Sequence, residues 1–165
     1  MAFDTYIKID TVKGESTAEG MTDFMEIMSF SFGASNPSSV GPGGGGSGGG
    51  RVSVSSFNVM KKSEAASATL FMACAQGDHF KTAEVVLRKA GGKDNKQSTF
   101  LTYKFEEVYV DSIQWSGSGG GDDSPTESVS FSFGKVEIEY SKQDATGKMA
   151  KAGQAIWDLR AVAAK

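Results

Sequence analysis

The sequence has almost none of the residues that build covalent cross-links or transition-metal sites. Its 165 residues include one cysteine, Cys74, and one histidine, His79. A single cysteine cannot form a disulfide within the chain, and zinc or haem sites need clustered Cys or His ligands. We therefore expect no internal disulfide, no metal site and no bound cofactor.

A strong excess of charge and long apolar runs are also missing. The chain has 17 Lys and Arg against 20 Asp and Glu, a formal net charge of -3. Nucleic acid is therefore not an expected partner, because phosphate backbones are bound through strong positive fields. No window approaches the roughly 20 apolar residues that cross a bilayer, so we expect no membrane insertion.

The first ten residues do not have the pattern of a cleavable signal peptide. Asp4, Lys8 and Asp10 interrupt any apolar run there. A secretory signal needs an uninterrupted apolar stretch after a basic start. We therefore expect a cytoplasmic product, and any later export would not use such a signal.

Glycine, in contrast, is abundant and clustered. Eight of the 21 glycines lie within residues 41–50, and four more lie within residues 117–121. Glycine runs leave the backbone unrestricted, so we expect two flexible loops within a single domain over residues 1–165. The G-x-G-x-x-G matches in the first run follow from composition alone. A strand rather than a helix follows them, so they do not indicate a nucleotide site.

Apolar and polar residues alternate with the period of a β-strand through most of the chain. Within residues 24–32 the alternation places Phe30 and Phe32 on the core face with the other even positions, and Ser29 and Ser31 on the opposite face. The alanine-rich end of the last segment is also compatible with a helix. The expected strands are residues 3–9, 24–32, 52–59, 83–89, 99–107, 108–115, 129–140 and 155–162.

The alternation changes parity at two places, near Ser55 and Ser56 and at Gly134. A one-residue change of parity indicates a β-bulge, and bulges bend strands. We therefore predict a mainly β fold, a small curved barrel or two-sheet sandwich of about eight strands. Residues 63–77, rich in Ala, Leu and Met, predict one flanking helix with an N-cap at Ser63 or Ser67. Its expected apolar stripe is Ala66, Leu70, Ala73 and Cys74.

No arrangement of reactive side chains indicates an enzyme. Cys74 lies on the apolar stripe of the predicted helix, where a free cysteine is usually a small buried apolar residue. Asp122, Asp123 and Glu127 form an acidic cluster without the spacing of a calcium loop, and we interpret them as surface charge. We therefore predict no catalytic residues.

Several motifs together resemble one family. They are DTYIKIDTVKGES at residues 4–16, LFMACAQGDHF at 70–80, EVVLRKAGG at 84–92 and SGSGGGDDSPTESVSFSFGKVEIEY at 116–140, with the glycine loop at 41–50 between them. The sequence resembles the Hcp (hemolysin-coregulated protein) family, the inner tube protein of the bacterial type VI secretion system. The resemblance covers almost the whole chain.

This resemblance implies a structural role. A member of the family forms a homohexameric ring, and rings stack into a tube that a contractile sheath expels with a spike protein at its tip. Small effector proteins travel in the lumen, so the protein is cytoplasmic before firing and is then secreted. The alternative that the residues leave open is a β-barrel carrier of a small apolar ligand.

Two sets of site residues follow from this interpretation. Ser29 and Ser31 are expected to face the lumen and its cargo, because short hydroxyls leave space there. The first glycine loop is expected to contact a neighbouring subunit or ring. That loop consists of Gly41, Pro42, Gly43, Gly44, Gly45, Gly46, Ser47, Gly48, Gly49 and Gly50.

Overall fold

The structure is a computed structural model that describes residues 2–37, 49–90, 96–121 and 123–164. Over these ranges it is mainly β, with one α-helix, α1 (Ala66–Gln76). The strands are β1 (Phe3–Ile9), β2 (Met25–Ile27), β3 (Ser29–Ser31), β4 (Ala34–Ser35), β5 (Ser53–Val54), β6 (Phe57–Lys62), β7 (His79–Ala90), β8 (Gln97–Ser116), β9 (Thr126–Gln143), β10 (Met149–Asp158) and β11 (Ala163–Ala164).

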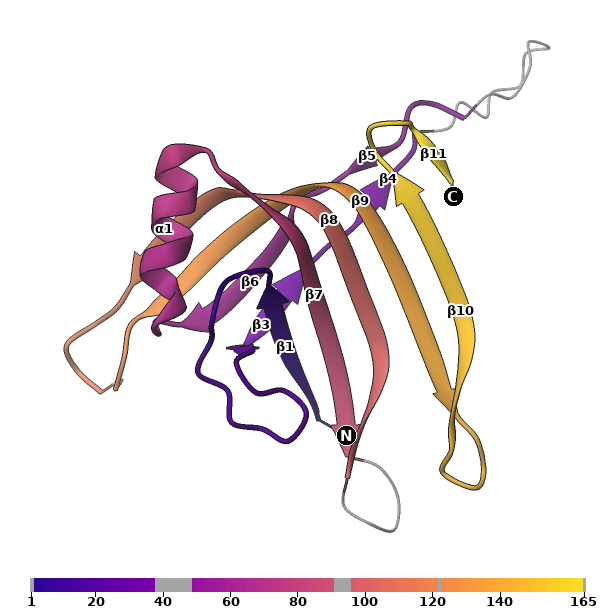
Figure 1. The fold of residues 1–165 in the computed structure, drawn as a ribbon, viewed down its shortest axis with the longest axis horizontal. Helices are drawn as coiled ribbons and strands as arrows, with labels where there is room; N and C mark the ends of the chain where they lie inside the picture. Colours follow the sequence, from indigo (N-terminus) through magenta and orange to yellow (C-terminus); the bar gives the residue numbers. More distant parts are fainter. Residues whose placement is uncertain (1, 38–48, 91–95, 122, 165) are drawn as a thin grey trace.

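The main sheet is antiparallel and closes on itself. Its order is β11-β10-β9-β8-β7-β1-β2, and β6 joins it by pairing with β9 on one side and β3 on the other. Because Met28 alone separates β2 from β3, one bent segment pairs with β1 through β2 and with β6 through β3. The result is a small curved barrel (Figure 1), which confirms the predicted fold class.

The sheet also extends beyond the barrel. On the edge away from β8, β9 pairs with β6 from Thr126 to Phe131 and with β10 from Lys135 to Gln143. We call this second region the wing: β10, residues 135–143 of β9, and residues 101–105 of β8, which pair with β9 there. In Figure 1 the wing lies at the right and α1 at the left.

The parity change predicted at Gly134 is present. Buried positions of β9 are odd-numbered up to Phe133, and the next buried residue is Val136. The neighbouring strand β8 is continuous at the same level, but its residue Glu107 has a φ of 56°. A positive φ breaks the regular pleat, so both strands change faces together. A Cβ atom at position 134 would lie 3.0 Å from Oε2 of Glu107, so the site has little room for a side chain.

Other strand boundaries differ from expectation in part. The bulge predicted near Ser55 and Ser56 is instead a break between two strands, because β5 pairs with β4 in a separate small sheet and β6 belongs to the main sheet. The two strands expected over residues 99–107 and 108–115 are a single strand, β8, because the chain continues through Glu107. The C-terminal segment forms a strand, β10, which begins earlier than predicted and ends at Asp158.

The prediction that the even-numbered residues of 24–32 all lie on the core face was wrong. Met25 and Ile27 are buried, whereas Glu26 and Met28 are exposed. Farther on, Phe30 and Phe32 pack against the core as predicted. The inward-facing residues are therefore odd-numbered before Met28 and even-numbered after it. The change occurs because the chain pairs with β1 before Met28 and with β6 after it.

The predicted helix is confirmed as α1, with a different start. Its C-cap is Gly77, whose φ of 70° is left-handed and whose N–H donates to the carbonyl oxygen of Ala73. The N-cap residue is Ala65, so neither predicted serine caps the helix. Oε1 of Glu15, in the loop after β1, accepts the Ala65 N–H at 3.2 Å instead. The predicted stripe faces the core, with Leu70 fully buried.

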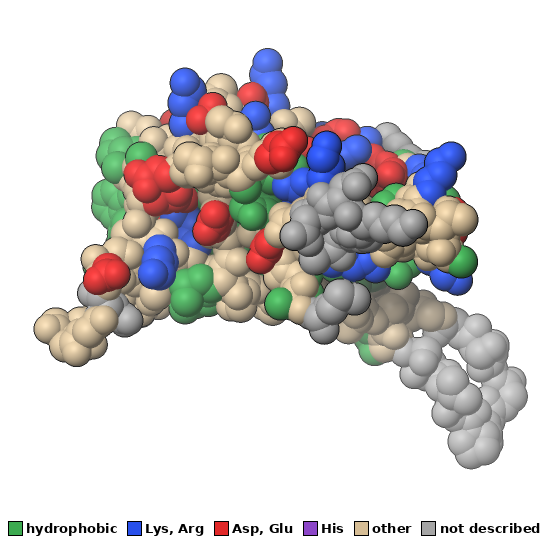
Figure 2. All heavy atoms as spheres, turned by 90° about the horizontal axis from the view of Figure 1, so that it is seen from below, with side chains coloured by type: hydrophobic (Ala, Val, Ile, Leu, Met, Phe, Trp, Pro, Cys, Tyr) green, Lys and Arg blue, Asp and Glu red, His purple; other side chains and the backbone are tan. Residues whose placement is uncertain are grey.

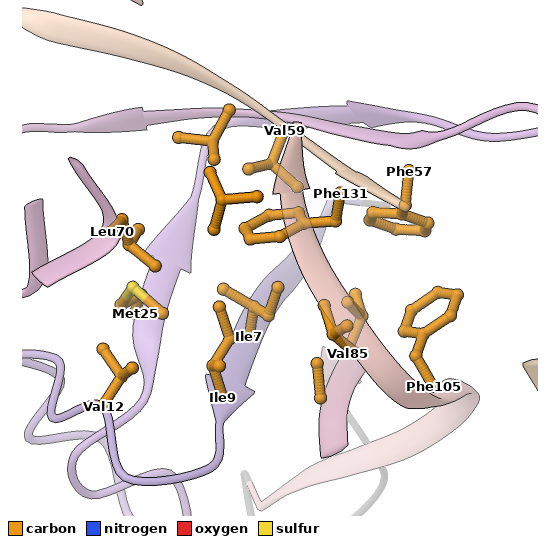
Figure 3. Close-up of a cluster of buried hydrophobic side chains, with 14 of the residues drawn as sticks. Ile7, Ile9, Val12, Met25, Phe57, Val59, Leu70, Val85, Phe105 and Phe131 are labelled. Atoms are coloured by element: carbon orange, nitrogen blue, oxygen red, sulfur yellow. The ribbon is translucent and has the colours of Figure 1, made fainter. Parts of the chain in front are cut away.

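The barrel interior is filled by apolar and aromatic side chains. Figure 3 shows Ile7, Val85, Phe131 and Leu70 converging from β1, β7, β9 and α1. Toward the wing the packing is aromatic, with closely spaced rings on β3, β6, β8 and β9. Ring centroids are 4.6 Å apart for Phe105 and Phe133 and 5.4 Å apart for Phe30 and Phe57.

One ion pair is buried where β6 and β9 meet α1. Nζ of Lys61 lies 2.6 Å from Oε1 of Glu127, and the two side chains are 1% and 0% exposed. Ser63 and Ser67 donate hydroxyl hydrogen bonds to the Glu127 carboxylate at 3.2 and 2.9 Å. Lys61 also reaches Oε1 of Glu64 at 3.2 Å. Glu127 is therefore not the surface charge expected from sequence, because its charge is neutralised inside the fold.

We expect Glu127→Gln to lower the free energy of unfolding by about 3 kcal/mol, because it leaves the Lys61 ammonium buried without its main counter-charge. Urea denaturation of the monomer measures this loss. The matched control is Glu106→Gln, which removes an exposed pair with Lys135 whose side chains are 50% and 23% exposed. That control should cost less than about 1 kcal/mol. Equal losses for the two variants would contradict the assigned role of burial.

Candidate assembly and cargo surfaces

Serine side chains cover the outer face of one side of the barrel. Four strands lie side by side there in the order β3, β6, β9, β8. Paired positions in antiparallel strands put their side chains on the same face. One row across the four strands is Ser31, Asn58, Ser130 and Ser112, and the next is Ser29, Met60, Ser128 and Gln114. We call these two rows the serine face.

Local sequence explains why small polar groups gather here. In β9 the order Ser128, Val129, Ser130, Phe131 alternates a hydroxyl with an apolar side chain, and the apolar members are buried. The hydroxyls then point away from the core. Asn58 donates to the hydroxyl of Ser31 at 3.5 Å and accepts from Ser130. The serine face is thus a polar layer, joined across strands by hydrogen bonds, over an apolar interior.

The two predicted lumen residues belong to this face. Ser29 and Ser31 are both exposed, and Phe30 between them packs inward. The other serines of the face were missed as site residues, although their alternation along β9 was visible in the sequence. Their alignment with Ser31 depends on β6 lying between β3 and β9, which local pattern does not reveal.

The outward side of another part of the same sheet is charged. A row across β1, β7, β8 and β9 consists of Lys8, Glu84, Lys104 and Glu137, so the sign alternates from strand to strand. Lys135 pairs with Glu106 at 2.7 Å, next to this row. We call this the charged face. In the view of Figure 2, acidic and basic side chains are interspersed and do not form separate patches of one sign.

A short ribbon carries the first glycine loop. β4 pairs with β5, and the N–H of Gly50 donates to the carbonyl oxygen of Pro37 at 2.9 Å. Both described ends of the loop are therefore held together at one corner of the molecule (Figure 1). Gly49 and Gly50 are exposed, and residues 41–48 of the predicted contact loop lie outside the described residues. The second predicted loop, 117–121, is exposed.

The pKa shifts of two tyrosines follow from burial. Burial raises the pKa of Tyr103, because it disfavours the phenolate. Burial also raises the pKa of Tyr6, and the nearby carboxylates Asp4 and Glu26 add to that effect. Both shifts favour the neutral phenol, which is the form suited to packing.

Cys74 and His79, the two side chains weighed as a nucleophile and base, contact different partners. Sγ of Cys74 lies 3.8 Å from the carbonyl oxygen of Asp111, and the His79 ring packs on Tyr109 with centroids 5.3 Å apart. Across the part of the chain that the structure describes, no group of His, Cys, Asp and Glu is arranged to hold a metal ion. Among the same residues, no helix is long and apolar enough to span a bilayer.

Three comparisons with known proteins agree. Residues 6–140 match the family model described as type VI secretion system effector, Hcp. Protein hcp1 of Pseudomonas aeruginosa is 37% identical over 163 residues, covering 97% of each chain. A solved type six secretion system protein has a TM-score of 0.92 at 38% identity, covering 99% of this chain and 100% of that one. Hcp1 from Salmonella typhimurium has a TM-score of 0.79 at 30% identity over 100% of both chains.

The solved structures and the curated relative cover nearly the whole chain, including the barrel and α1. The resemblance seen in the sequence motifs is therefore confirmed. The chain belongs to the Hcp family of the type VI secretion system.

Proposed function

We infer that the chain acts as a tube subunit of the type VI secretion system, as its membership of the Hcp family indicates. We propose that six copies close into a ring and that rings stack into the tube. The observation that carries this proposal is the contrast between the two outer faces of one small barrel. A tube wall needs an inner and an outer surface of different chemistry, and the serine face and the charged face supply them.

The serine face is proposed to line the lumen, with Ser29 and Ser31 among its cargo-facing residues. Hydroxyl groups both donate and accept hydrogen bonds, so they suit a wall that holds proteins of varied surface. Their small size also leaves the hole open. Effector proteins carried there would be shielded until delivery.

The charged face is proposed to look outward, toward the contractile sheath. Its alternating signs leave little net field, which suits a surface that must slide when the sheath contracts. A spike protein would sit at the tube tip. The protein would be cytoplasmic before firing and would leave the cell within the tube.

The alternative, a carrier of a small apolar ligand, is not favoured. A carrier barrel encloses a wide cavity. Here Phe57, Phe105 and Phe133 occupy the interior, and the Phe105 ring contacts the rings of both others. The family assignment also points to the tube.

Electron microscopy with size-exclusion mass measurement tests the assembly. We expect annular particles with an open centre and a mass of about six times the 17.4 kDa chain. A protein that stays monomeric at high concentration would overturn the proposal.

We expect Ser31→Tyr to reduce cargo retention at least about tenfold, the change produced by about 1.4 kcal/mol of lost affinity. The phenol ring fills space in the lumen that a serine hydroxyl leaves free. Proteins retained on tagged rings isolated from the source bacterium would be quantified by mass spectrometry. The matched control, Ser118→Tyr, adds the same ring in an exposed loop and should retain cargo normally. Unchanged retention in Ser31→Tyr rings would contradict the lumen assignment.

Deleting residues 41–50 is expected to abolish tube formation while the monomer still folds. A glycine-rich segment gains order only when its backbone groups find partners, which an adjacent subunit or ring would provide. Circular dichroism and urea denaturation report folding, and electron microscopy reports tubes. Loss of folding in this variant would indicate a structural role within the subunit instead.

A further inference from the structure

One carboxylate is held on the outward side of the sheet, directly beside the serine face. The register of β8 and β9 shifts between Val110 and Ser112, which leaves Asp111 as an extra residue of β8. Such a bulge changes the direction of side chains. Val110 is buried, and the two residues after it, Asp111 and Ser112, are both exposed. The bulge therefore places a carboxylate next to an uncharged row of the serine face.

Contacts from three neighbouring segments fix Asp111 in place. Ser56, just before β6, donates to Oδ2 of Asp111 at 2.8 Å, and Ser132 of β9 donates to Oδ1 at 2.7 Å. Sγ of Cys74 on α1 lies 3.8 Å from the carbonyl oxygen of Asp111. A carboxylate has about four acceptor positions, so two hydroxyl donors leave positions for further donors. Asp111 is thus an ordered carboxylate that can still accept hydrogen bonds from a partner.

The charge of Asp111 is not balanced within the subunit. Hydroxyl donors carry no net charge, and among the described residues no Lys or Arg forms an ion pair with Asp111. Toward the wing, the next outward residue of β9 is Lys135, and Glu106 already pairs with it at 2.7 Å. Toward β7, the outward side continues as Tyr109 and His79, and an imidazole is largely neutral at pH 7.

A cation lies at the other end of the serine face, too far away to neutralise Asp111. It is Lys62, the exposed last residue of β6. Lys62 is six residues from Ser56 in the sequence, which is about 20 Å along an extended strand. That exceeds the Debye length of about 8 Å at physiological salt. The serine face therefore has a fixed negative charge at the end nearer the wing.

We propose that Asp111 selects cargo by favouring effector proteins that present Lys or Arg to the lumen wall. This inference rests on the proposed function, in which the serine face lines a ring of six copies. Sixfold repetition would place six carboxylates on one wall, and a cavity lined by one sign of charge concentrates the opposite charge. The hydroxyls provide hydrogen bonds for many partners, whereas Asp111 discriminates among them by charge.

A cationic side chain fits this position better than a metal ion. Calcium takes six to eight oxygen ligands, about half of them charged in its usual loops, whereas Asp111 is joined only by two hydroxyl groups. No group of the described residues is arranged to hold a metal ion. Lys and Arg instead need one accessible carboxylate, and a charge-assisted hydrogen bond to it is stronger than a bond to a neutral serine.

The test compares two variants that remove the same charge from different places. Asp111→Asn keeps the shape of the side chain, and the matched control Asp78→Asn changes an exposed residue that follows α1, away from the serine face. The probes are a fluorescent peptide of alternating Lys and Ser and its counterpart with Glu in place of Lys. Fluorescence anisotropy measures their binding to purified rings at low and at physiological salt.

We expect unaltered rings to prefer the Lys peptide, and Asp111→Asn to weaken its binding at least about threefold, the size of an exposed charge contact. Binding of the Glu peptide should not weaken. Asp78→Asn should keep the preference, and Asp111→Glu, which restores the charge, should recover it.

Equal effects of the two Asn variants, or no effect of either, would overturn the role of Asp111 and leave the proposed tube function standing. Loss of rings in Asp111→Asn alone would also overturn it, because Asp111 would then belong to a contact between subunits. An unaltered chain that never forms rings would overturn both the tube function and this inference.

Discussion

The structure depends on one long strand, β9, that belongs to two regions of the main sheet, the barrel and the wing. Its first half pairs with β6 inside the barrel, and its second half pairs with β10 in the wing. One continuous backbone therefore couples the serine face to the charged face, and hydrogen bonding to β8 extends along both halves. A change that weakens β9 would disturb both faces of a tube wall together.

The buried charges stand directly behind the serine face. Lys61 and Glu127 are paired positions on β6 and β9, and Ser67 brings α1 into the same network. Such a pair contributes little net stability compared with apolar packing, but it tolerates few other arrangements of its partners. Because the pair lies where β6, β9 and α1 meet, it helps to define how these three elements align.

Sequence patterns predicted the local features well. Alternation located most strands, the parity change at Gly134 and the outward direction of Ser29 and Ser31. Features set by distant partners could not be predicted this way. The turn at Met28 arises because β2 and β3 pair with different strands, and the serine face exists only once β6 separates β3 from β9. The burial of Glu127 could not be predicted from local pattern, because its counter-ion Lys61 lies far away in the sequence.

The coincident change of faces at Gly134 and Glu107 restricts how this chain can vary in length. On β9 the outward residues are Ser128, Ser130 and Ser132 before it, and Lys135, Glu137 and Glu139 after it. Because side chains alternate with a period of two, removing one residue near this point would turn the later carboxylates and the lysine toward the aromatic interior. Insertions and deletions are thereby confined to the turns, such as the hairpin between β9 and β10, where an added residue leaves every pairing in phase.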